Sequence, residues 1–505
     1  MPRRAVVIGA GTAGVLAAAA LAPVVDEVIV LDRDDLPGGP DHRRGVPQGR
    51  HAHLLMAGGL EAIDALVPAS VDIRDHLRDA GAKEISLAKG MLALTPEGWF
   101  RRWSRDGHHM VTCTRALLDW AVRTAVMRYR GISVHRAHAR ALLGSAARVT
   151  GVRVGAVGGA GFAPRFTALE GLRVSADGAE ADLAADFVVD ASGRGSRIVT
   201  WLEEVGITGV QERTLDTGLV NSTRIFRTPP GAEGWPLTLV QPDPFTGEPG
   251  RSGMVVPIED DAGGARWMVS FGGSRGGEPP KDEEKFLQYA FDLPHPIVGQ
   301  LVAGAEPLTP VFTSHSSSNA RRYLEKAPAW PDGLVVLGDA LATFNPLYGQ
   351  GMSVAALSAL ALARTVRDRW GTPGLARRAQ REVAKPIEAA WTLAVSSDVL
   401  YPGIVGGGPT LADRISARYT RRLVRAATGS YPAASALWDV TSVKAGPLRL
   451  LRPAVVTAAL AGPPLPRLSG PPLTRAEHEI LRRLTDRPQP APYPPPPPRG
   501  PDHQP

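Results

Sequence analysis

The chain has 505 residues, which is enough for two or three domains with a large buried core. Its single cysteine, Cys113, excludes an intramolecular disulfide and a metal site built from cysteines, and it suits a reducing cytoplasm, where we expect the protein. The formal net charge is +7, but only seven of the 57 basic residues are lysines. The basic residues are scattered, with no lysine-rich run and no basic stripe interleaved with aromatic residues, which argues against nucleic-acid binding.

The first residues predict a strand, a glycine-rich turn, a helix and a second strand. The apolar run 5–8 precedes the motif Gly9-Ala10-Gly11-Thr12-Ala13-Gly14, a helical pattern covers 15–22, and the apolar run 28–31 ends on Asp32. In a dinucleotide-binding fold the three glycines permit a tight turn, close approach of a pyrophosphate and close packing of the helix. The N–H groups at the helix N-terminus face the phosphates, and the acid accepts hydrogen bonds from ribose. We therefore expect cofactor-binding residues here at Gly9, Gly11, Ala13, Gly14, Asp32 and Arg33.

The same segment has a second interpretation. Arg3-Arg4 followed by an apolar run resembles a secretory or twin-arginine signal peptide. Three glycines at fixed spacing interrupt that run, no clear small-residue cleavage site follows, and the pattern continues into the second strand. We therefore favour the dinucleotide fold. No other stretch of 18 uncharged apolar residues predicts a membrane span.

The following segments alternate between loops, helices and strands. The Pro/Gly-rich stretch after Asp32 predicts a loop to about Gly45. Short alternating runs indicate a β-meander between 132 and 187, within which the glycine-dense stretch 155–161 is interpreted as a hairpin loop. The segment 218–271 predicts an antiparallel sheet, and 333–337 predicts a buried strand. Helical patterns cover 53–67, 72–80, 115–129 and 352–369, and 375–484 is mostly helical.

Histidines and hydroxyl residues provide no metal or triad signature. The chain has twelve histidines but no HxxxH or HExxH spacing, and His51 and His53 are interpreted as a structural pair on a strand. No Ser-His-Asp arrangement is recognisable. We predict no metal site and no protein nucleophile.

Two downstream motifs complete a family pattern. One is the run from Asp186 to Arg197, which contains Asp190-Ala191-Ser192-Gly193, and the other is Gly338-Asp339 followed by Pro346 and Gly349-Gln350-Gly351-Met352. In order and separation the three motifs resemble the fingerprints of the single-component FAD monooxygenases related to p-hydroxybenzoate hydroxylase. The resemblance implies non-covalent FAD, with Arg115 reaching the pyrophosphate or ribityl region and Asp339 binding the ribityl chain. The helix that begins near Gly349 would aim its N-terminus at the flavin N1–C2=O edge, so the further cofactor-binding residues implied are Arg50, Arg115, Asp339, Pro346, Gly349, Gln350, Gly351 and Met352.

The resemblance also implies an α/β fold, with a Rossmann-type FAD-binding domain, an inserted antiparallel β-sheet substrate domain and a C-terminal helical region. The arginine-rich C-terminal helices could dock on a membrane surface or cover the FAD domain, and we favour packing. The expected organisation is a discontinuous FAD-binding domain at 1–85, 110–205 and 328–372, a substrate domain at 86–109 and 206–327, a helical region at 373–485, and a disordered proline-rich tail at 486–505.

A closer resemblance is carried by residues 42–53 and 344–355, which look like the bacterial flavin epoxidases of polyether-antibiotic pathways. Residues 351–355 are also similar to squalene epoxidases. The resemblance implies that the reduced flavin and O2 form a C4a-hydroperoxide, which epoxidises an alkene of an apolar polyene or polyketide substrate in secondary metabolism. Such oxygen transfer needs positioning and a dry pocket. Candidates for lining the reactive side of the flavin are Arg50, His51, Asn345 and Tyr348.

One position departs from the family pattern. The hydroxylases carry Ala-Asp-Gly where this chain has Ala191-Ser192-Gly193, and that motif is associated with both FAD and NAD(P)H. The electron source is therefore left open between NAD(P)H and a partner flavin reductase.

Three alternative functions share this fold. An aromatic polyketide hydroxylase would need a base or relay near the ring. A flavin-dependent halogenase can also carry Asp-Ala-Ser-Gly, but its WxWxIP motif is absent. A non-catalytic protein that has lost flavin would be colourless after purification.

Overall fold

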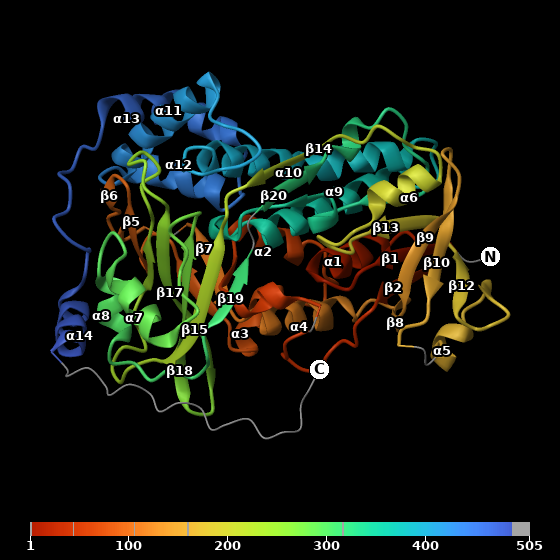
Figure 1. The fold of residues 1–505 in the computed structure, drawn as a ribbon, viewed down its shortest axis with the longest axis horizontal. Helices are drawn as coiled ribbons and strands as arrows, with labels where there is room; N and C mark the ends of the chain where they lie inside the picture. Colours follow the sequence, from red (N-terminus) through yellow and green to blue (C-terminus); the bar gives the residue numbers. More distant parts are fainter. Residues whose placement is uncertain (1–2, 44, 106, 159–160, 316–317, 487–505) are drawn as a thin grey trace.

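The computed structural model describes residues 3–43, 45–105, 107–158, 161–315 and 318–486. The predicted proline-rich tail lies outside these residues, apart from Asp486. Figure 1 shows a parallel sheet with long helices beside it and a larger, mainly antiparallel sheet with helices on both sides. The predicted α/β fold class is confirmed, while the division into domains at the expected residues stays a prediction.

A five-stranded parallel sheet forms the nucleotide-binding half. Four of its strands are largely buried on both faces, as the continuous apolar runs predict, because helices cover a parallel sheet, whereas the edge strand Ile132–Arg136 is partly exposed. Every pairing in it is parallel. In spatial order the strands are β21 (Leu334–Val336), β13 (Phe187–Asp190), β1 (Arg4–Ile8), β2 (Glu27–Asp32) and β8 (Ile132–Arg136).

The helix α1 (Thr12–Leu21) confirms the predicted strand–turn–helix unit. Gly9 adopts a φ of 99°, which disfavours any residue with a side chain. A Cβ at Gly14 would collide with the Gly9 carbonyl oxygen, so the close contact between helix and turn requires glycine at both positions.

The predicted β-meander is only partly correct. Residues 138–184 form a separate antiparallel sheet, but the flanking strands β8 and β13 belong to the parallel sheet. After Gly155 the chain passes through the short helix α5 (Pro164–Thr167), so a simple hairpin loop does not follow β10; residues 159–160 lie outside the described residues. The four antiparallel strands are β11 (Leu172–Val174), β12 (Glu180–Ala184), β10 (Val149–Gly155) and β9 (His138–Gly144).

The predicted antiparallel sheet of residues 218–271 is confirmed and extended by segments from elsewhere in the chain. The β5 strand pairs with β16 in parallel, while the other pairings are antiparallel. The seven strands in order are β19 (Phe312–His315), β15 (Val220–Arg227), β18 (Gly264–Gly273), β17 (Arg251–Asp261), β16 (Leu237–Val240), β5 (Met91–Thr95) and β6 (Gly98–Trp99).

Alternate residues of this seven-stranded sheet enter two different cores. Trp267 and Val269 pack with the helices α7 (Glu283–Phe291), α8 (Ile297–Val302) and α14 (Arg475–Thr485). Met268, between them, packs on the opposite face, where the C-terminal helices lie. This is the period-two pattern of a sheet covered on both sides.

Two small sheets connect the halves, and one corrects a predicted helix. Helical structure was expected over 53–67, but residues 53–55 form a strand because they pair with Val111–Cys113, and α2 follows at Ala57–Asp64. The predicted helix 72–80 is confirmed as α3 (Ile73–Asp79), capped by Asp72. The small sheets comprise β3 (His53–Leu55), β7 (His109–Cys113) and β4 (Lys83–Ser86), and β14 (Glu212–Asp216), β20 (Ser318–Arg322) and β22 (Ala342–Thr343).

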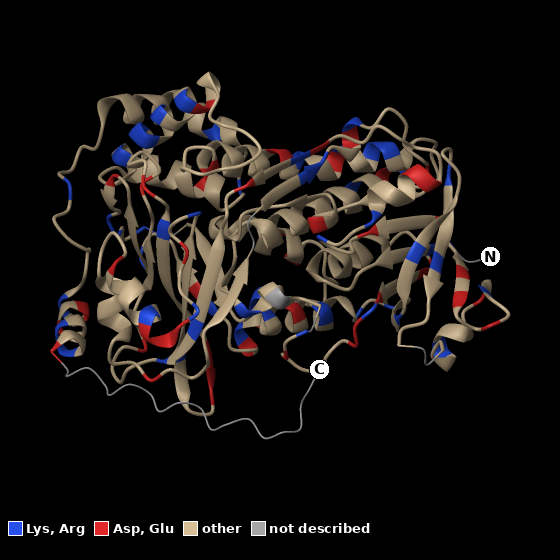
Figure 2. Cartoon of the chain, viewed as in Figure 1, with Lys and Arg blue, Asp and Glu red and all other residues tan. Residues whose placement is uncertain are grey.

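The long helix α9 (Gly351–Arg369) and the mostly helical region after it are confirmed. α9 packs against both α1 and α10. The three helices after α10, which are α11, α12 and α13, pack over the seven-stranded sheet (Figure 1). Figure 2 shows Lys and Arg gathered along α11, whose buried face is apolar. Among the described residues no helix is both long and apolar enough to cross a bilayer. The helices of this region are α10 (Leu375–Asp398), α11 (Leu411–Ala427), α12 (Tyr431–Thr441), α13 (Pro453–Ala461) and α14.

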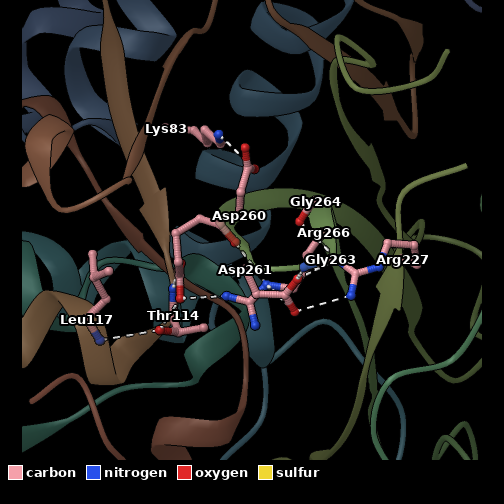
Figure 3. A network of polar contacts seen from close by, with 10 residues as sticks. Lys83, Thr114, Leu117, Arg227, Asp260, Asp261, Gly263, Gly264 and Arg266 are labelled. Atoms are coloured by element: carbon pink, nitrogen blue, oxygen red, sulfur yellow. Dashed lines mark hydrogen bonds and ion pairs between the residues drawn. The ribbon is translucent and has the colours of Figure 1, made fainter. Parts of the chain in front are cut away.

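A buried carboxylate connects the seven-stranded sheet to helix α4 (Arg115–Val126). Glu259 on β17 accepts hydrogen bonds from the Thr114 backbone N (2.8 Å) and hydroxyl (2.6 Å), while the Thr114 hydroxyl caps Leu117 N. Arg266 lies 3.3 Å from the same carboxylate. Figure 3 shows Thr114, Leu117 and Arg266 within this network. The sheet therefore determines where α4 begins.

The packing of α10 generates a first prediction. Val383 and Ile387 are fully buried in the main core, so a chain that ends before Leu375 exposes the apolar surface of α9. We expect this truncated protein to be insoluble, as measured by the soluble fraction after expression. A chain that ends at Asp486 is the control, which should stay soluble and bind FAD normally. Soluble, FAD-loaded protein from the shorter chain would contradict this packing.

Candidate functional site

A cavity of about 630 Å³ extends from the glycine-rich turn to the seven-stranded sheet. This volume falls in the range of about 300–1,000 Å³ that is typical of small-molecule sites. The turn after β1, the loop after β21 and the start of α9 contribute one side, and β15, β17, β18 and β19 contribute the other. It contains most of the predicted site residues, namely Gly9, Gly11, Ala13, Asp32, Arg33, His51, Arg115, Asp339, Asn345, Pro346, Gly349, Gln350, Gly351 and Met352.

The glycine-rich turn leaves space for a phosphate. A Cβ built at Gly11 would meet no atom within 4 Å. As the N-cap residue of α1, Gly11 has no side chain that could bond to the free N–H groups of the helix. The first N–H groups of the helix therefore face the cavity with their positive partial charge. Gly14 is not a lining residue, because its role is the contact with Gly9.

Asp32 lies at the end of β2 with both carboxylate oxygens engaged. Oδ2 accepts from Ala10 N and from Arg43 Nη2, each at 2.7 Å, and Oδ1 accepts from Asp34 N at 2.9 Å. Sequence reasoning did not single out Arg43, because it lies in a loop without periodicity. Its Nε is buried without a hydrogen-bond partner among the described residues, although the side chain lines the cavity. Such an orphaned donor fits an anionic or oxygen-rich ligand.

Arg115 is held at the first position of α4. Its Nη2 donates to the Thr12 hydroxyl (2.8 Å) and its Nε to Asp119 (2.8 Å), which also accepts from the Thr12 hydroxyl (2.7 Å). Asp339 lines the cavity nearby. Burial raises the pKa of its carboxyl, while the charges of Arg115 and Arg194 act against that rise. The site can therefore hold both a phosphate and hydroxyl groups.

The predicted loop from Pro346 to Gly351 leads directly into α9. Gly349 has a φ of 63°, which favours glycine, and Gln350 occupies the helix cap without a side-chain hydrogen bond to the helix. Its side-chain Nε2 donates instead to the Thr441 carbonyl at the end of α12 (3.1 Å). A Cβ at Gly351 would meet nothing within 4 Å. The N-terminus of α9 is thus open to a ligand, and the C-terminal helices secure its position.

Asn345 and Tyr348 point to a buried acid that the sequence did not reveal. The Asp398 carboxylate accepts from Tyr348 Oη (2.7 Å), Asn345 Nδ2 (3.1 Å) and Asn319 Nδ2 (2.6 Å). Burial is the main cause that raises the pKa of Asp398, and the pKa of Tyr348 rises well above its ordinary value because of burial and the Asp398 charge. Asn345 still lines the cavity, whereas Tyr348 is not among its described lining residues.

Arg50 also lies apart from the described cavity lining. Its guanidinium stacks over the Phe312 ring, 4.5 Å from the centroid, and the side chain is exposed. The roles predicted for Arg50 and Tyr348 at the flavin stay predictions.

His51 is part of a hydrogen-bonded chain that reaches the seven-stranded sheet. His51 Nδ1 lies 2.9 Å from Thr223 Oγ1, which lies 2.5 Å from Ser270 Oγ. Burial lowers the pKa of His51 to about 4 and, with Arg115, that of His53 to about 3, so both are neutral at pH 7. His53 Nδ1 contacts the His51 carbonyl oxygen. No group of residues suited to hold a metal occurs within the described part of the chain.

Part of the cavity lining is apolar, and it comes from both sides of the cavity. Short-range sequence patterns could not show that residues from β3, from β17 and from the start of α9 would line one cavity. Ser192, the departure from the family motif, turns its hydroxyl to Asp190 (2.6 Å). This apolar lining, called the apolar wall below, consists of Leu54, Met254, Phe344, Leu347 and Met352, whereas the Phe271 side chain packs into the core on the other face of the sheet.

The donor set of the cavity fits FAD. The wall contains more arginines than carboxylates, as a diphosphate requires: Arg33, Arg43, Arg115, Arg194 and Arg197 against Asp32, Asp34 and Asp339. The open turn at Gly11, the orphaned Arg43 Nε and the open start of α9 would receive the phosphates and the flavin edge.

Comparisons with known proteins find a relative in sequence and similar folds among solved structures. Protein Rv3254 of Mycobacterium tuberculosis is 30% identical over 411 residues, which cover 79% of this chain and 80% of that protein. The flavin-dependent brominase Bmp2 has a similar fold, with a TM-score of 0.57 and 15% identity over 90% of this chain and 98% of Bmp2. PqsL from Pseudomonas aeruginosa, described as a probable FAD-dependent monooxygenase, has a TM-score of 0.54 and 16% identity over 78% and 96% of the two chains.

The family assignment rests on sequence. The FAD binding domain family matches residues 3–368, which include the glycine-rich turn, Asp339 and the start of α9. This match covers well over half of the chain. The chain therefore belongs to the FAD binding domain family.

Proposed function

We propose that the protein is an FAD-dependent monooxygenase that epoxidises an alkene of an apolar polyene or polyketide in secondary metabolism. The observation that carries this proposal is that one cavity is lined both by a dinucleotide turn and by an apolar wall. The resemblance of residues 42–53 and 344–355 to polyether-pathway epoxidases and the fold likeness to PqsL support it. Bound and reduced, FAD would supply the activation of O2 and the oxygen atom that enters the substrate.

The residues of the chain have positioning roles in this proposal. The α9 N-terminus, with Gly351 at its start, would stabilise negative charge on bound reduced flavin. Leu347 and Met254 hold an apolar chain and exclude water. Because His51 is neutral at pH 7, it adds no charge beside the alkene.

The electron source belongs to the proposal as well. Because Ser192 replaces the family aspartate, NAD(P)H and a partner flavin reductase both remain candidates. NADPH oxidation by the purified protein under air, with and without an added flavin reductase, distinguishes the two.

Aromatic hydroxylation is the second candidate function. The observation that favours it is the chain from His51 through Thr223 to Ser270, since a relay of this kind can move a phenolic proton away from the ring. Incubation with a reductant, O2 and either polyene or aromatic polyketide substrates, followed by mass spectrometry, tests both candidates. A polyene product that gains one oxygen atom and opens to a diol in acid supports epoxidation. A hydroxylated aromatic product, or halogen incorporation like that named for Bmp2, would overturn it.

Asp32 provides the sharpest test of cofactor placement. Asp32→Ala removes a charged acceptor for the ribose hydroxyls, and such hydrogen bonds are worth about 1.5–3 kcal/mol. We expect FAD affinity to fall about tenfold or more, as measured by titration of the apoprotein with FAD. Asp35→Ala is the matched control, because Asp35 is exposed and outside the cavity. Unchanged affinity in Asp32→Ala would show that this acid does not bind the cofactor.

Gly351 tests the placement of the reaction. A valine here has space in the protein but would project into the cavity beneath the flavin. A displacement of about 1 Å can cost about a hundredfold in rate. We expect Gly351→Val to keep FAD, while the amount of product formed per reductant consumed falls and hydrogen peroxide release rises. Gly351→Ala should give values between those of the wild type and of Gly351→Val. Wild-type coupling in Gly351→Val would mean that this turn lies away from the chemistry.

His51 makes stability depend on pH. Its pKa is about 4 in the folded protein and ordinarily 6.5, so between these values the unfolded chain binds the additional proton. The free energy of unfolding should therefore fall as pH drops from 6.5 towards 4. We expect His51→Gln to reduce this slope, measured by urea unfolding at several pH values. Substitution of the exposed His478 should leave it unchanged, and an unchanged slope in His51→Gln would contradict the burial argument.

A further inference from the structure

A buried amide without a partner lies in the wall of the cavity. Asn221 on β15 is only 6% exposed and lines the cavity. Its Nδ2 is buried and has no hydrogen-bond partner among the described residues. Because folded proteins satisfy nearly all such groups, an orphaned amide at a ligand cavity points to a ligand.

A second orphaned group lies directly beside the first. Ser314 on β19 is the register partner of Asn221, and its Oγ is also buried without a partner in the described structure. Ser314 lines the same cavity. Two neighbouring strands therefore place two unsatisfied polar groups at one point of the wall.

The next row of the same sheet face behaves differently. Thr223 lies two residues further along β15, and it is satisfied by His51 and by its cross-strand neighbour Ser270. Met254 continues that row as an apolar residue. The lack of partners is thus specific to Asn221 and Ser314 and is not a property of the whole face.

The position of the pair relative to the flavin loop follows from Gly272. This glycine is the register partner of Asn221 on β18, and a Cβ at Gly272 would collide with Leu347 and approach the Asn221 amide. The loop that precedes α9 therefore presses on the sheet beside the pair. A group bound by Asn221 would lie next to this loop.

We propose that Asn221 and Ser314 form a hydrogen-bonding subsite for a neutral oxygen group, a hydroxyl or a carbonyl, on the otherwise apolar substrate. An amide and a hydroxyl offer both donors and acceptors without charge, which suits a neutral oxygen. A site built to bond such a group discriminates strongly against an analogue that lacks it. The proposal rests on the proposed function and assigns its substrate a polar group that fixes which alkene reaches the flavin.

The test measures binding without turnover. FAD-loaded protein is titrated anaerobically with all-trans-farnesol and with the matched hydrocarbon that lacks the hydroxyl, and the change in flavin absorbance gives each dissociation constant. We expect the wild-type protein to bind the alcohol about tenfold more tightly than the hydrocarbon. Asn221→Leu and Ser314→Ala should each remove most of this preference by weakening alcohol binding, with hydrocarbon binding retained.

Ser252→Ala is the matched control. Ser252 lies on the same sheet face but donates to the Gly272 carbonyl and is not among the described cavity residues, so its loss should leave the preference intact. FAD content and thermal unfolding show whether each variant is folded, and Ser314→Ala serves if Asn221→Leu does not fold.

If Asn221→Leu and Ser314→Ala still prefer the alcohol as strongly as the wild type, the proposed subsite is wrong. An ordered water would then be the partner of the two groups. Equal wild-type affinities, or no binding of either probe, would overturn the subsite too. The two proposals can fail separately because binding is measured without turnover. Failure to detect an epoxide would refute the proposed function, whereas the measured preference for the alcohol would still show whether the subsite exists.

Discussion

The buried carboxylate of Asp398 is the interaction on which the candidate flavin site depends. It has no cationic partner in the described structure, so its charge must be stabilised by the hydrogen bonds of Asn319, Asn345 and Tyr348. Two of these donors belong to the loop that precedes α9, and Asn345 Oδ1 in turn accepts from Leu347 N. Satisfying one acid on α10 therefore determines the conformation of the loop. Since leaving a buried charge unpaired is costly, the loop has little freedom to move away from the cavity.

The C-terminal helices hold the same region from a second direction. The end of α12 accepts hydrogen bonds from Gln350 through the Thr441 carbonyl and from Gly58 N through the Ser442 carbonyl. The next residue, Val443, has a φ of 51°, a left-handed conformation that is unfavourable for a β-branched residue. The chain tolerates this strain where it contacts α2 and the cap of α9. The helices beyond residue 368, where the family match ends, are thus part of the architecture of the site.

Local patterns were sufficient for elements whose partners are near in sequence. The glycine-rich turn and α9 were predicted because glycine spacing and helical periodicity encode them directly. Residues 53–55 were wrongly expected to be helical, because their pairing with β7, more than fifty residues away, decides their conformation. The same limit applies to the site. Asp32 could be predicted because it belongs to a sequence motif, whereas the roles of Asp398 and Asn221 depend on contacts between segments that are distant in the sequence.

The bond between Glu259 and Thr114 has a mechanical consequence. Because this carboxylate holds the first turn of α4, a substrate that displaces β17 would also displace Arg115, which lines the same cavity as Met254 of β17. Occupation of the sheet and occupation of the nucleotide turn are then energetically linked, and such linkage is reciprocal. Binding of either ligand would then change the affinity for the other through the contact between β17 and the start of α4.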